Sequence, residues 1–309
     1  MNKRKTKKRI QKGGGKVKKR QQNTQKKFKK PKCSIERNNS YTCYTNEALL
    51  KLKELWNARH PDVKIETNEP KEIWKSLRDN MIDVCDRESC WLKQKFIDNN
   101  VASELLSHTF APKAPKSWDK NPNTWLTSLD IDRVMKQYEH AYPNFLFIGP
   151  SPIDFDSRIQ DNECVWDELC NFDLKKLLGK GKNKIGIVFN TDPHYKDGSH
   201  WISLFINIKE GYIFFFDSAG DKVPKEIKIF ADRVIEQGEK LGLNLKFEEN
   251  YPKAHQKGNS ECGMYSLYMI TSVLRGKKKP KDFIDGELVS DKKMEELRKE
   301  YFNKSEELE

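Results

Sequence analysis

Three short apolar segments between residues 185 and 217 constrain the fold more than any other part of the sequence. IGIVFN, WISLFINI and GYIFFFD are rich in Ile, Val and Phe, and turn residues separate them. Such segments are typical of β-strands. Because helical spacing dominates before and after them, helices and strands occur in separate blocks. The sequence therefore predicts an α+β fold with a central sheet.

Helical spacing precedes the sheet in two regions. NEALLKLKELWNARH places three leucines and Trp56 on one stripe, and similar spacing continues to about residue 110. A proline-containing loop follows, and WLTSLDIDRVMKQYEHAY restores a helical pattern from Trp125. We therefore expect a domain boundary near residue 120.

The chain after residue 217 is predicted to mix further helices with one strand. ADRVIEQGEKLGL has helical spacing, and NLKFEENY is typical of a short strand. A buried helix is expected to begin near Cys262, and DKKMEELRKEYFNKSEELE is predicted to form a charged terminal helix.

The positive charge of the chain is concentrated at its start. Residues 1–32 contain 16 Lys and Arg and no acidic residue, whereas the whole chain has a net charge of +12, so the remainder carries −4. This segment lacks hydrophobic periodicity. We expect a mobile polycation that contacts nucleic acid or an acidic partner through counterion release. A solubility tail or a nuclear-import signal is the alternative.

Seven cysteines, at positions 33, 43, 85, 90, 164, 170 and 262, lack the dense pattern of a small secreted disulfide scaffold. We therefore expect free thiols in a protein made in a reducing compartment. No pair has the zinc-binding C-x2-C spacing, so no metal site is predicted. No run approaches the ~18 apolar residues of a membrane span, and no apolar signal segment follows the basic start, so we expect a soluble protein without membrane contact.

The predicted hairpin brings a histidine close to an aspartate. If Lys209 and Glu210 form a two-residue turn, residues face each other when their numbers sum to 419. His200 and Asp217 then share a face at the diagonal separation of roughly 7–8 Å that side chains can bridge. A three-residue loop would send the carboxylate to the other face. Taken singly, a histidine and an aspartate at such positions are more often structural than catalytic.

The segment QKGNSECGMYSLYMI places Cys262 at the start of a predicted buried helix, after a polar turn. If Ser260 or Asn259 caps this helix, the thiol falls in the first turn, where unpaired N–H groups and the macrodipole favour a thiolate. The default alternative for a free cysteine is a small buried hydrophobe. Gln256 and the backbone N–H of Cys262 could donate to an oxyanion. With the predicted imidazole–carboxylate pair, the set comprises a nucleophile, a base, an orienting carboxylate and an oxyanion donor.

The order of SHW, FFFDS and QKGNSECG resembles a cysteine protease family that includes the SUMO-specific, or ubiquitin-like-protein, proteases and the adenovirus maturation protease. The family's chain order of His, Asp, Gln and Cys matches His200, Asp217, Gln256 and Cys262. WLTSLDIDRVMKQYE also looks like the start of the family's catalytic domain. Composition, basic tail and CDRESCWL look most like the branch found in large cytoplasmic DNA viruses. The turn before Cys262 departs from the Asn-Gly-aromatic-Asp sequence that is common in the family.

The resemblance implies a domain order and a mechanism. We expect a disordered basic tail (1–32), a helical N-terminal region (33–119), a catalytic domain (120–276) with a mixed sheet flanked by helices, and a C-terminal helical extension (277–309). The implied activity is that of a cysteine endopeptidase without a cofactor. In it Cys262 attacks and His200 transfers the proton, while Asp217 orients the imidazole and Gln256 binds the oxyanion.

The resemblance also implies protein substrates with Gly-Gly-like cleavage sites. Tryptophans at the positions of Trp125 and Trp201 close over the substrate in that family and leave room for glycine alone, although each could be a core or boundary aromatic. Virion precursor proteins are the favoured substrates, and host proteins joined to ubiquitin-like modifiers are the alternative. The competing class is an inactive scaffold that binds nucleic acid through its tail. Gly13–Gly15 is either a flexible break or a self-processing site. We expect the protein in the virion and the host cytoplasm, with nuclear entry through the tail.

Overall fold

The structure is a computed structural model that describes residues 28–35, 40–304 and 308 of the chain. The predicted basic tail up to residue 27, with its nucleic-acid contact and Gly13–Gly15, lies outside the described residues. Within the described part, no helix is long and apolar enough to cross a membrane.

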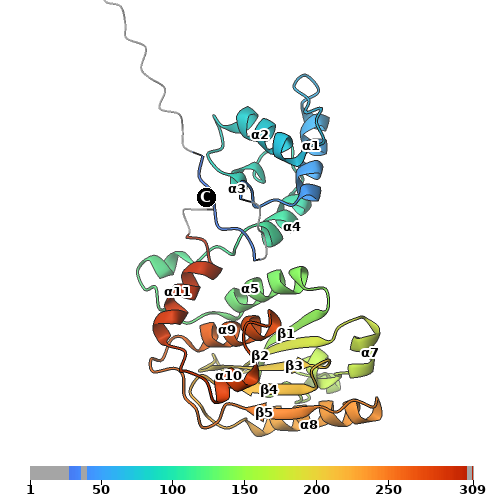
Figure 1. The fold of residues 1–309 in the computed structure, drawn as a ribbon, viewed down its shortest axis with the longest axis vertical. Coiled ribbons are helices and arrows are strands. Elements are labelled where there is room, and N and C mark those ends of the chain that lie inside the picture. Colours follow the sequence, from blue (N-terminus) through green and yellow to red (C-terminus); the bar gives the residue numbers. More distant parts are fainter. Residues whose placement is uncertain (1–27, 36–39, 305–307, 309) are drawn as a thin grey trace, which may run out of the picture.

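A five-stranded mixed sheet forms the centre of the fold (Figure 1). The outer strand pairs are parallel and the inner pairs are antiparallel. The predicted α+β fold with a mixed sheet is confirmed, although the prediction omits the first strand. In spatial order, which is also chain order, the strands are β1 (Phe145–Pro152), β2 (Lys184–Asn190), β3 (Trp201–Asn207), β4 (Tyr212–Phe216) and β5 (Lys246–Glu249).

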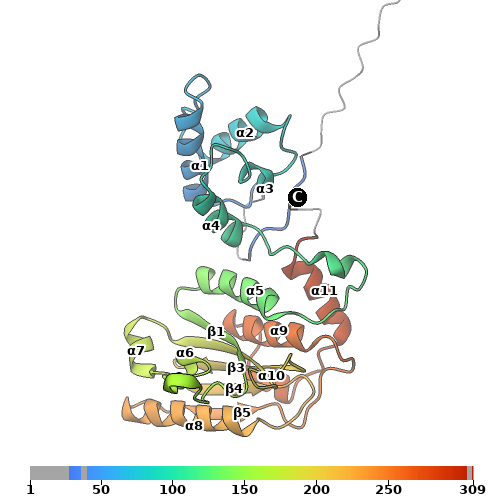
Figure 2. The ribbon, with the colours of Figure 1, turned by 180° about the vertical axis from the view of Figure 1, so that it is seen from behind.

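Alternate residues of the strands pack on opposite faces of the sheet, as the two-residue period of a strand requires. Ile202 and Leu204 of β3 join the apolar cluster on one face, whereas Phe205 joins the cluster on the other. The sheet is thus the middle layer of three (Figure 1, Figure 2). The first face is covered by α6 (Asp167–Cys170), α7 (Leu174–Gly179) and α8 (Lys225–Lys240), and the second by α5 (Ser128–Ala141), α9 (Cys262–Leu274), α10 (Pro280–Ile284) and α11 (Asp291–Tyr301).

Helix α9 lies directly against the sheet, and all of its residues except Tyr268 are buried. Gly186 of β2 permits this close approach. A Cβ at this position would lie 2.8 Å from Ile270 Cγ2 and 2.9 Å from Phe145 Cζ. The packing therefore fixes the first residue of α9, Cys262, relative to the central strands.

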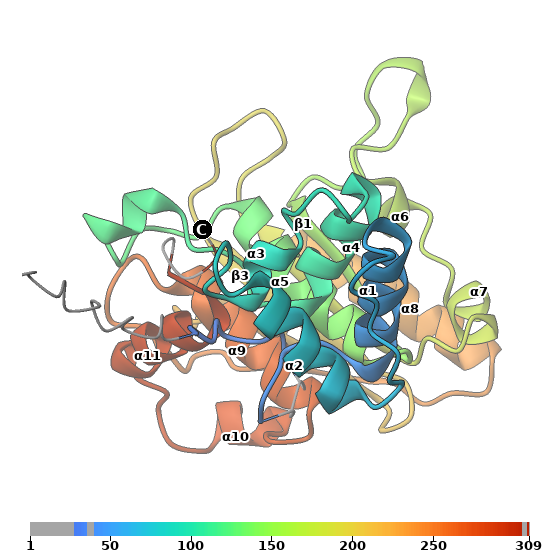
Figure 3. The same cartoon turned by 90° about the horizontal axis from the view of Figure 1, so that it is seen from above.

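The predicted helical N-terminal region is confirmed and has an apolar cluster of its own. That cluster runs from Cys43 to Phe110 and includes Leu308. The region lies above α5, and its α4 contacts α5 (Figure 1, Figure 3). Its helices are α1 (Asn46–Arg59), α2 (Pro70–Met81), α3 (Glu88–Trp91) and α4 (Asn99–Thr109); the 3₁₀-helices are Lys116–Asp119 and Gln160–Asn162.

Asn303, just after α11, joins the N-terminal region to the sheet layers. Its Nδ2 donates to the carbonyls of Lys32 at 2.9 Å and of Ala111 at 2.8 Å, and its Oδ1 accepts from the Lys32 N–H at 2.7 Å. Asn303 is completely buried. The last residues of the predicted tail are therefore already bonded to the folded body.

The expectation that all cysteines are free is wrong for six of the seven. The described residues include all seven, and the structure contains the disulfides Cys33–Cys43, Cys85–Cys90 and Cys164–Cys170, with Cα–Cα separations of 5.0, 5.5 and 6.2 Å. Local turns bring the partners of each pair within the distance that a disulfide spans, which a count of cysteines does not show. Cys262 is the one free cysteine.

Replacing Gly186 with Ala is expected to destabilise the fold by about 1–3 kcal/mol, because the new methyl group overpacks the contact between α9 and the sheet. Urea titration measures the free energy of unfolding. Gly179→Ala on α7 is the matched control, since no atom lies within 4 Å of a Cβ built there. A similar loss of stability in both variants would contradict the close packing of α9.

Candidate active site

The register of the central hairpin brings His200 and Asp217 together. Ser203 of β3 pairs with Phe216 of β4, so that the numbers of paired residues sum to 419 as predicted. His200 directly precedes β3 and Asp217 directly follows β4. The His200 Nε2 atom lies 2.7 Å from Asp217 Oδ1. The predicted meeting of imidazole and carboxylate is confirmed.

Asn250, at the end of β5, holds the backbone of Asp217. Its Oδ1 accepts from the Asp217 N–H at 2.9 Å, and its Nδ2 donates to the Asp217 carbonyl at 2.7 Å and to the Lys253 carbonyl at 2.8 Å. The Asn250 side chain is completely buried. Asp217 Oδ1 also accepts from the Ala219 N–H at 2.8 Å. These bonds fix the carboxylate that faces His200. Asn250 is not predictable from the sequence, because no local pattern links it to a residue 33 positions earlier.

The surroundings of His200 favour its charged form. Burial alone would lower the pKa of the imidazole, but the hydrogen bonds and charges of Asp217 and Cys262 raise it to about 10. Because Asp217 occupies Nε2, the Nδ1 atom is the one available to exchange a proton with Cys262. The structure therefore places a charged imidazole between a carboxylate and a thiol.

Cys262 is the first residue of α9 and is 1% exposed. Its first-turn position is confirmed, whereas the predicted cap is wrong. Glu261 occupies the N-cap position and makes no side-chain cap bond, and Ser260 Oγ instead donates to Glu261 Oε1 at 2.6 Å. The first N–H groups of α9 are therefore left without a side-chain acceptor, at the positive end of the helix dipole.

Gln256 lies on the turn before α9 and is tied to the loop after Asp217. Its Oε1 accepts from Ser218 Oγ at 2.7 Å, and its backbone N–H donates to the Ser218 carbonyl at 2.9 Å. Its Nε2 donates to the Gly258 carbonyl at 2.9 Å, which uses one of its two amide protons. The turn that carries the amide is thus fastened next to the His200–Asp217 pair.

The two tryptophans singled out from the sequence differ in exposure. Trp201 is buried, and its Nε1 donates to the Leu126 carbonyl at 2.9 Å. A Cβ on Gly263, the residue after the thiol, would lie 3.0 Å from Leu126 Cβ. Leu126 is thereby held between Trp201 and the start of α9, and its neighbour Trp125 is 39% exposed. The predicted roles of Trp125 and Trp201 in substrate binding stay predictions.

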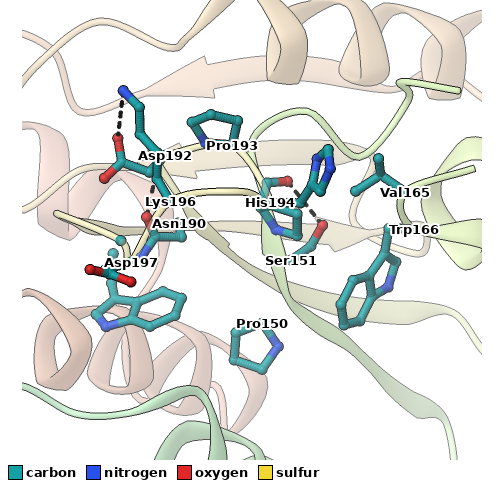
Figure 4. A pocket seen from close by; sticks show the side chains of 13 residues that line it. Pro150, Ser151, Val165, Trp166, Asn190, Asp192, Pro193, His194, Lys196 and Asp197 are labelled. Atoms are coloured by element: carbon teal, nitrogen blue, oxygen red, sulfur yellow. Dashed lines mark hydrogen bonds and ion pairs between the residues drawn. The ribbon is translucent and has the colours of Figure 1, made fainter. Parts of the chain in front are cut away.

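A pocket of about 280 Å³ opens beside Trp201 (Figure 4). Trp166 and His194 line one side of it and Asp192 lies on the other. His194 Nδ1 lies 2.7 Å from Asp154 Oδ2, so the molecule holds a second histidine–carboxylate pair. No cysteine lines this pocket, although Ser151 does. Among the described residues, no group of three or more His, Cys, Asp or Glu side chains could hold a metal ion.

Comparison with known proteins agrees with this arrangement. Residues 180–309 match the family model of the Ulp1 protease family, C-terminal catalytic domain. A protein of Acanthamoeba polyphaga mimivirus that is named as a thiol protease is 29% identical over 273 residues, which are 87% of this chain and 86% of that protein. The chain is a cysteine protease, and its residues 180–309 are similar to the Ulp1 catalytic domain.

Two further comparisons involve African swine fever virus. A cysteine protease of this virus is 27% identical to this chain over 221 residues, which cover 66% of this chain and 78% of that protein. The crystal structure of a protease from the same virus shares the fold, with a TM-score of 0.61, 23% identity, and coverage of 88% of this chain and 95% of that one. The shared fold includes the helical N-terminal region, because it extends over most of both chains.

In Asp217→Asn, we expect the pKa of His200 to fall well below 10, because burial then opposes the charge without the facing carboxylate. NMR titration of histidine-labelled protein from about pH 5 to about pH 11 measures it. Asp154→Asn, in the second pair, is the control and should leave the titration of His200 unchanged.

The same shift links His200 to stability. The pKa of His200 is higher in the folded protein than the usual 6.5. The charged imidazole therefore contributes fully to the free energy of unfolding below about pH 6.5, and this contribution is lost as the pH rises through about 10. A wild-type imidazole that loses its proton near pH 6.5 would show that the pair with Asp217 is not formed.

Proposed function

We propose that the protein is an endopeptidase whose nucleophile is Cys262, with His200 as general base and acid and Asp217 as the residue that orients the imidazole. The contact of 2.7 Å between His200 Nε2 and Asp217 Oδ1, beside a free thiol at the first residue of α9, carries this proposal. The Ulp1-type match of residues 180–309 spans all three side chains.

The chemistry follows from the three groups. The thiolate of Cys262 attacks the carbonyl carbon of the scissile bond, and the imidazolium of His200 gives its proton to the leaving amine as the C–N bond breaks. A thioester remains on Cys262. His200 then takes a proton from water, whose oxygen attacks the thioester. The C–S bond breaks, the carboxylic acid product leaves, and the thiolate of Cys262 and the imidazolium of His200 are restored. Asp217 stays ionised throughout and stabilises the imidazolium.

The tetrahedral intermediates carry a negative oxygen that requires donors already in position. The backbone N–H of Cys262 is one such donor, since no side chain caps α9. The second is the remaining amide proton of Gln256, whose turn is held by Ser218. Removing one donor of this kind typically costs about 10²–10³ in kcat.

The proposed substrates are proteins that are cut after Gly-Gly or Ala-Gly. Trp125 is exposed beside Leu126, which itself touches Gly263 at the start of α9. An indole at this place would narrow the approach to Cys262, and exclusion of larger side chains would give the preference for glycine. Trp201 acts by holding the Leu126 carbonyl in place.

Virion precursor proteins are the natural substrates we favour, because relatives come from large DNA viruses, in mimivirus and African swine fever virus. Deconjugation of ubiquitin-like modifiers is the alternative, since a further relative is named a SUMO-1 cysteine protease. We also propose the virion and the host cytoplasm as its locations and, for the basic segment 1–32, contact with nucleic acid or an acidic partner.

An irreversible probe with a peptide ending in Gly-Gly and a thiol-reactive group tests the proposed nucleophile. Wild-type protein should be labelled at Cys262, and Cys262→Ala should neither be labelled nor cleave a Gly-Gly peptide substrate. The six cysteines in disulfides serve as internal controls for general thiol reactivity. Cleavage that persists in Cys262→Ala would overturn the proposal and leave the scaffold alternative or another nucleophile.

A series of peptides varied at the two residues before the cut tests the specificity. We expect kcat/KM to fall at least about 100-fold when Leu replaces the glycine next to the bond, because the channel excludes its side chain. Trp125→Ala should reduce this preference, whereas Leu288→Ala, an exposed residue outside the proposed channel, should not. Equal cleavage of the Gly and Leu peptides by the wild type would show that no such channel exists.

A further inference from the structure

The carboxylate of Asp291, the first residue of α11, contacts the turn that precedes α9. Its Oδ2 accepts from the Gly258 N–H at 2.8 Å and from the Lys257 N–H at 3.1 Å. Its Oδ1 accepts from the hydroxyl of Tyr265 at 2.8 Å. One side chain thus receives hydrogen bonds from both the turn and α9.

Tyr265 is completely buried in the first turn of α9, three residues after Cys262. Burial, and after it the hydrogen bond and charge of Asp291, raise the pKa of Tyr265 above its usual value. The hydroxyl therefore remains a donor at all working pH values. The Val289 carbonyl also lies 2.8 Å from this hydroxyl, so the single hydroxyl proton is shared between Val289 and Asp291. Asp291 is consequently connected to the same helical turn as the nucleophile.

The middle of the turn is exposed to solvent. Lys257, Gly258 and Asn259 are exposed, and Gly258 lacks a side chain that could pack. Ser218 holds Gln256 from the side of the His200–Asp217 pair. Asp291 holds the next two residues, Lys257 and Gly258. Without it, the backbone that follows Gln256 would lose two of its hydrogen bonds to a charged acceptor, and such bonds are the stronger kind.

We propose that Asp291 is a positioning residue for the oxyanion donors, acting by fixing the turn of Gln256 relative to the first turn of α9. The proposal rests on the function proposed above. Donors stabilise a developing oxyanion only if they are already placed where the charge will form. Displacement of reacting groups by about 1 Å can cost about 100-fold in rate. The C-terminal helix therefore belongs to the apparatus of the active site, although none of its residues touches the substrate in this scheme.

Asp291→Asn is the first test, because it keeps the shape of the side chain but places an amide group where two N–H groups donate. We expect kcat to fall between about 10-fold and about 100-fold with little change in KM. Each kcat is normalised to the fraction of protein that the thiol probe labels, which removes losses due to unfolding. Glu300→Gln, the same charge change at an exposed position of α11, is the control and should leave kcat unchanged.

A double-mutant cycle with Gln256→Ala separates positioning from general support. If Asp291 acts through the Gln256 amide, Asp291→Asn should cost much less in the Gln256→Ala background than in the wild type. A loss of equal size in both backgrounds, or no loss in the wild type, would overturn the proposal. If Asp291→Asn fails to fold, Tyr265→Phe takes its place in the cycle. It removes one of the bonds to Asp291 and should show the same non-additivity with a smaller loss.

Two variants distinguish a wrong role for Asp291 from a wrong proposed function. Should Cys262→Ala still cleave the peptide, the proposed mechanism is wrong whatever the cycle gives. Should Cys262→Ala be inactive while Gln256→Ala cleaves at the wild-type rate, the nucleophile stands and the positioning role of Asp291 is wrong.

Discussion

The antiparallel pairing of β3 with β4 is the constraint on which the candidate site depends. A shift of this pairing by one residue would move every side chain of a strand to the opposite face of the sheet. Both faces are fully packed, with Ile202 and Leu204 in one cluster and Phe205 in the other. The free energy of burying these side chains therefore fixes the register. His200 and Asp217, at the open end of the same hairpin, meet because the core allows no alternative.

Burial and charge oppose each other at His200. Removing an imidazole from water disfavours its charged form. At the partly buried His200, this desolvation offsets part of the stabilisation that the Asp217 carboxylate provides. The carboxylate prevails because it is itself held, by the Ala219 N–H on one oxygen and by Asn250 on the backbone. A carboxylate free to turn toward water would orient the imidazole poorly. The fixed geometry of Asp217 is therefore as important as its charge.

The sequence predicts those features that depend on local patterns. The Ile- and Phe-rich runs in residues 201–216 predict strands, and helical spacing predicts α5, α8 and α9. The predicted register is correct, although residues 208–211 form a longer turn than the two-residue turn expected. Features that depend on distant contacts escape prediction. Strand β1 has a short apolar run that a helix or strand could equally contain. The disulfides require knowledge of which turns bring cysteines together, and the cap of α9 is decided by how the turn of Gln256 is held.

The supports of the site come from far along the chain for a physical reason. A nucleophile at a helix start needs its first N–H groups uncapped, so the residues before it cannot provide the usual side-chain acceptor. The local bonds of the turn, from Gln256 to Gly258 and from Ser260 to Glu261, do not cap the helix. Acceptors must come from elements that the fold brings alongside, and here they are Ser218 after β4 and Asp291 at the start of α11. Apolar residues of α11 such as Met294 and Leu297 belong to the same cluster as α9. The packing that buries α9 therefore also places Asp291, at the start of α11, against the turn before Cys262.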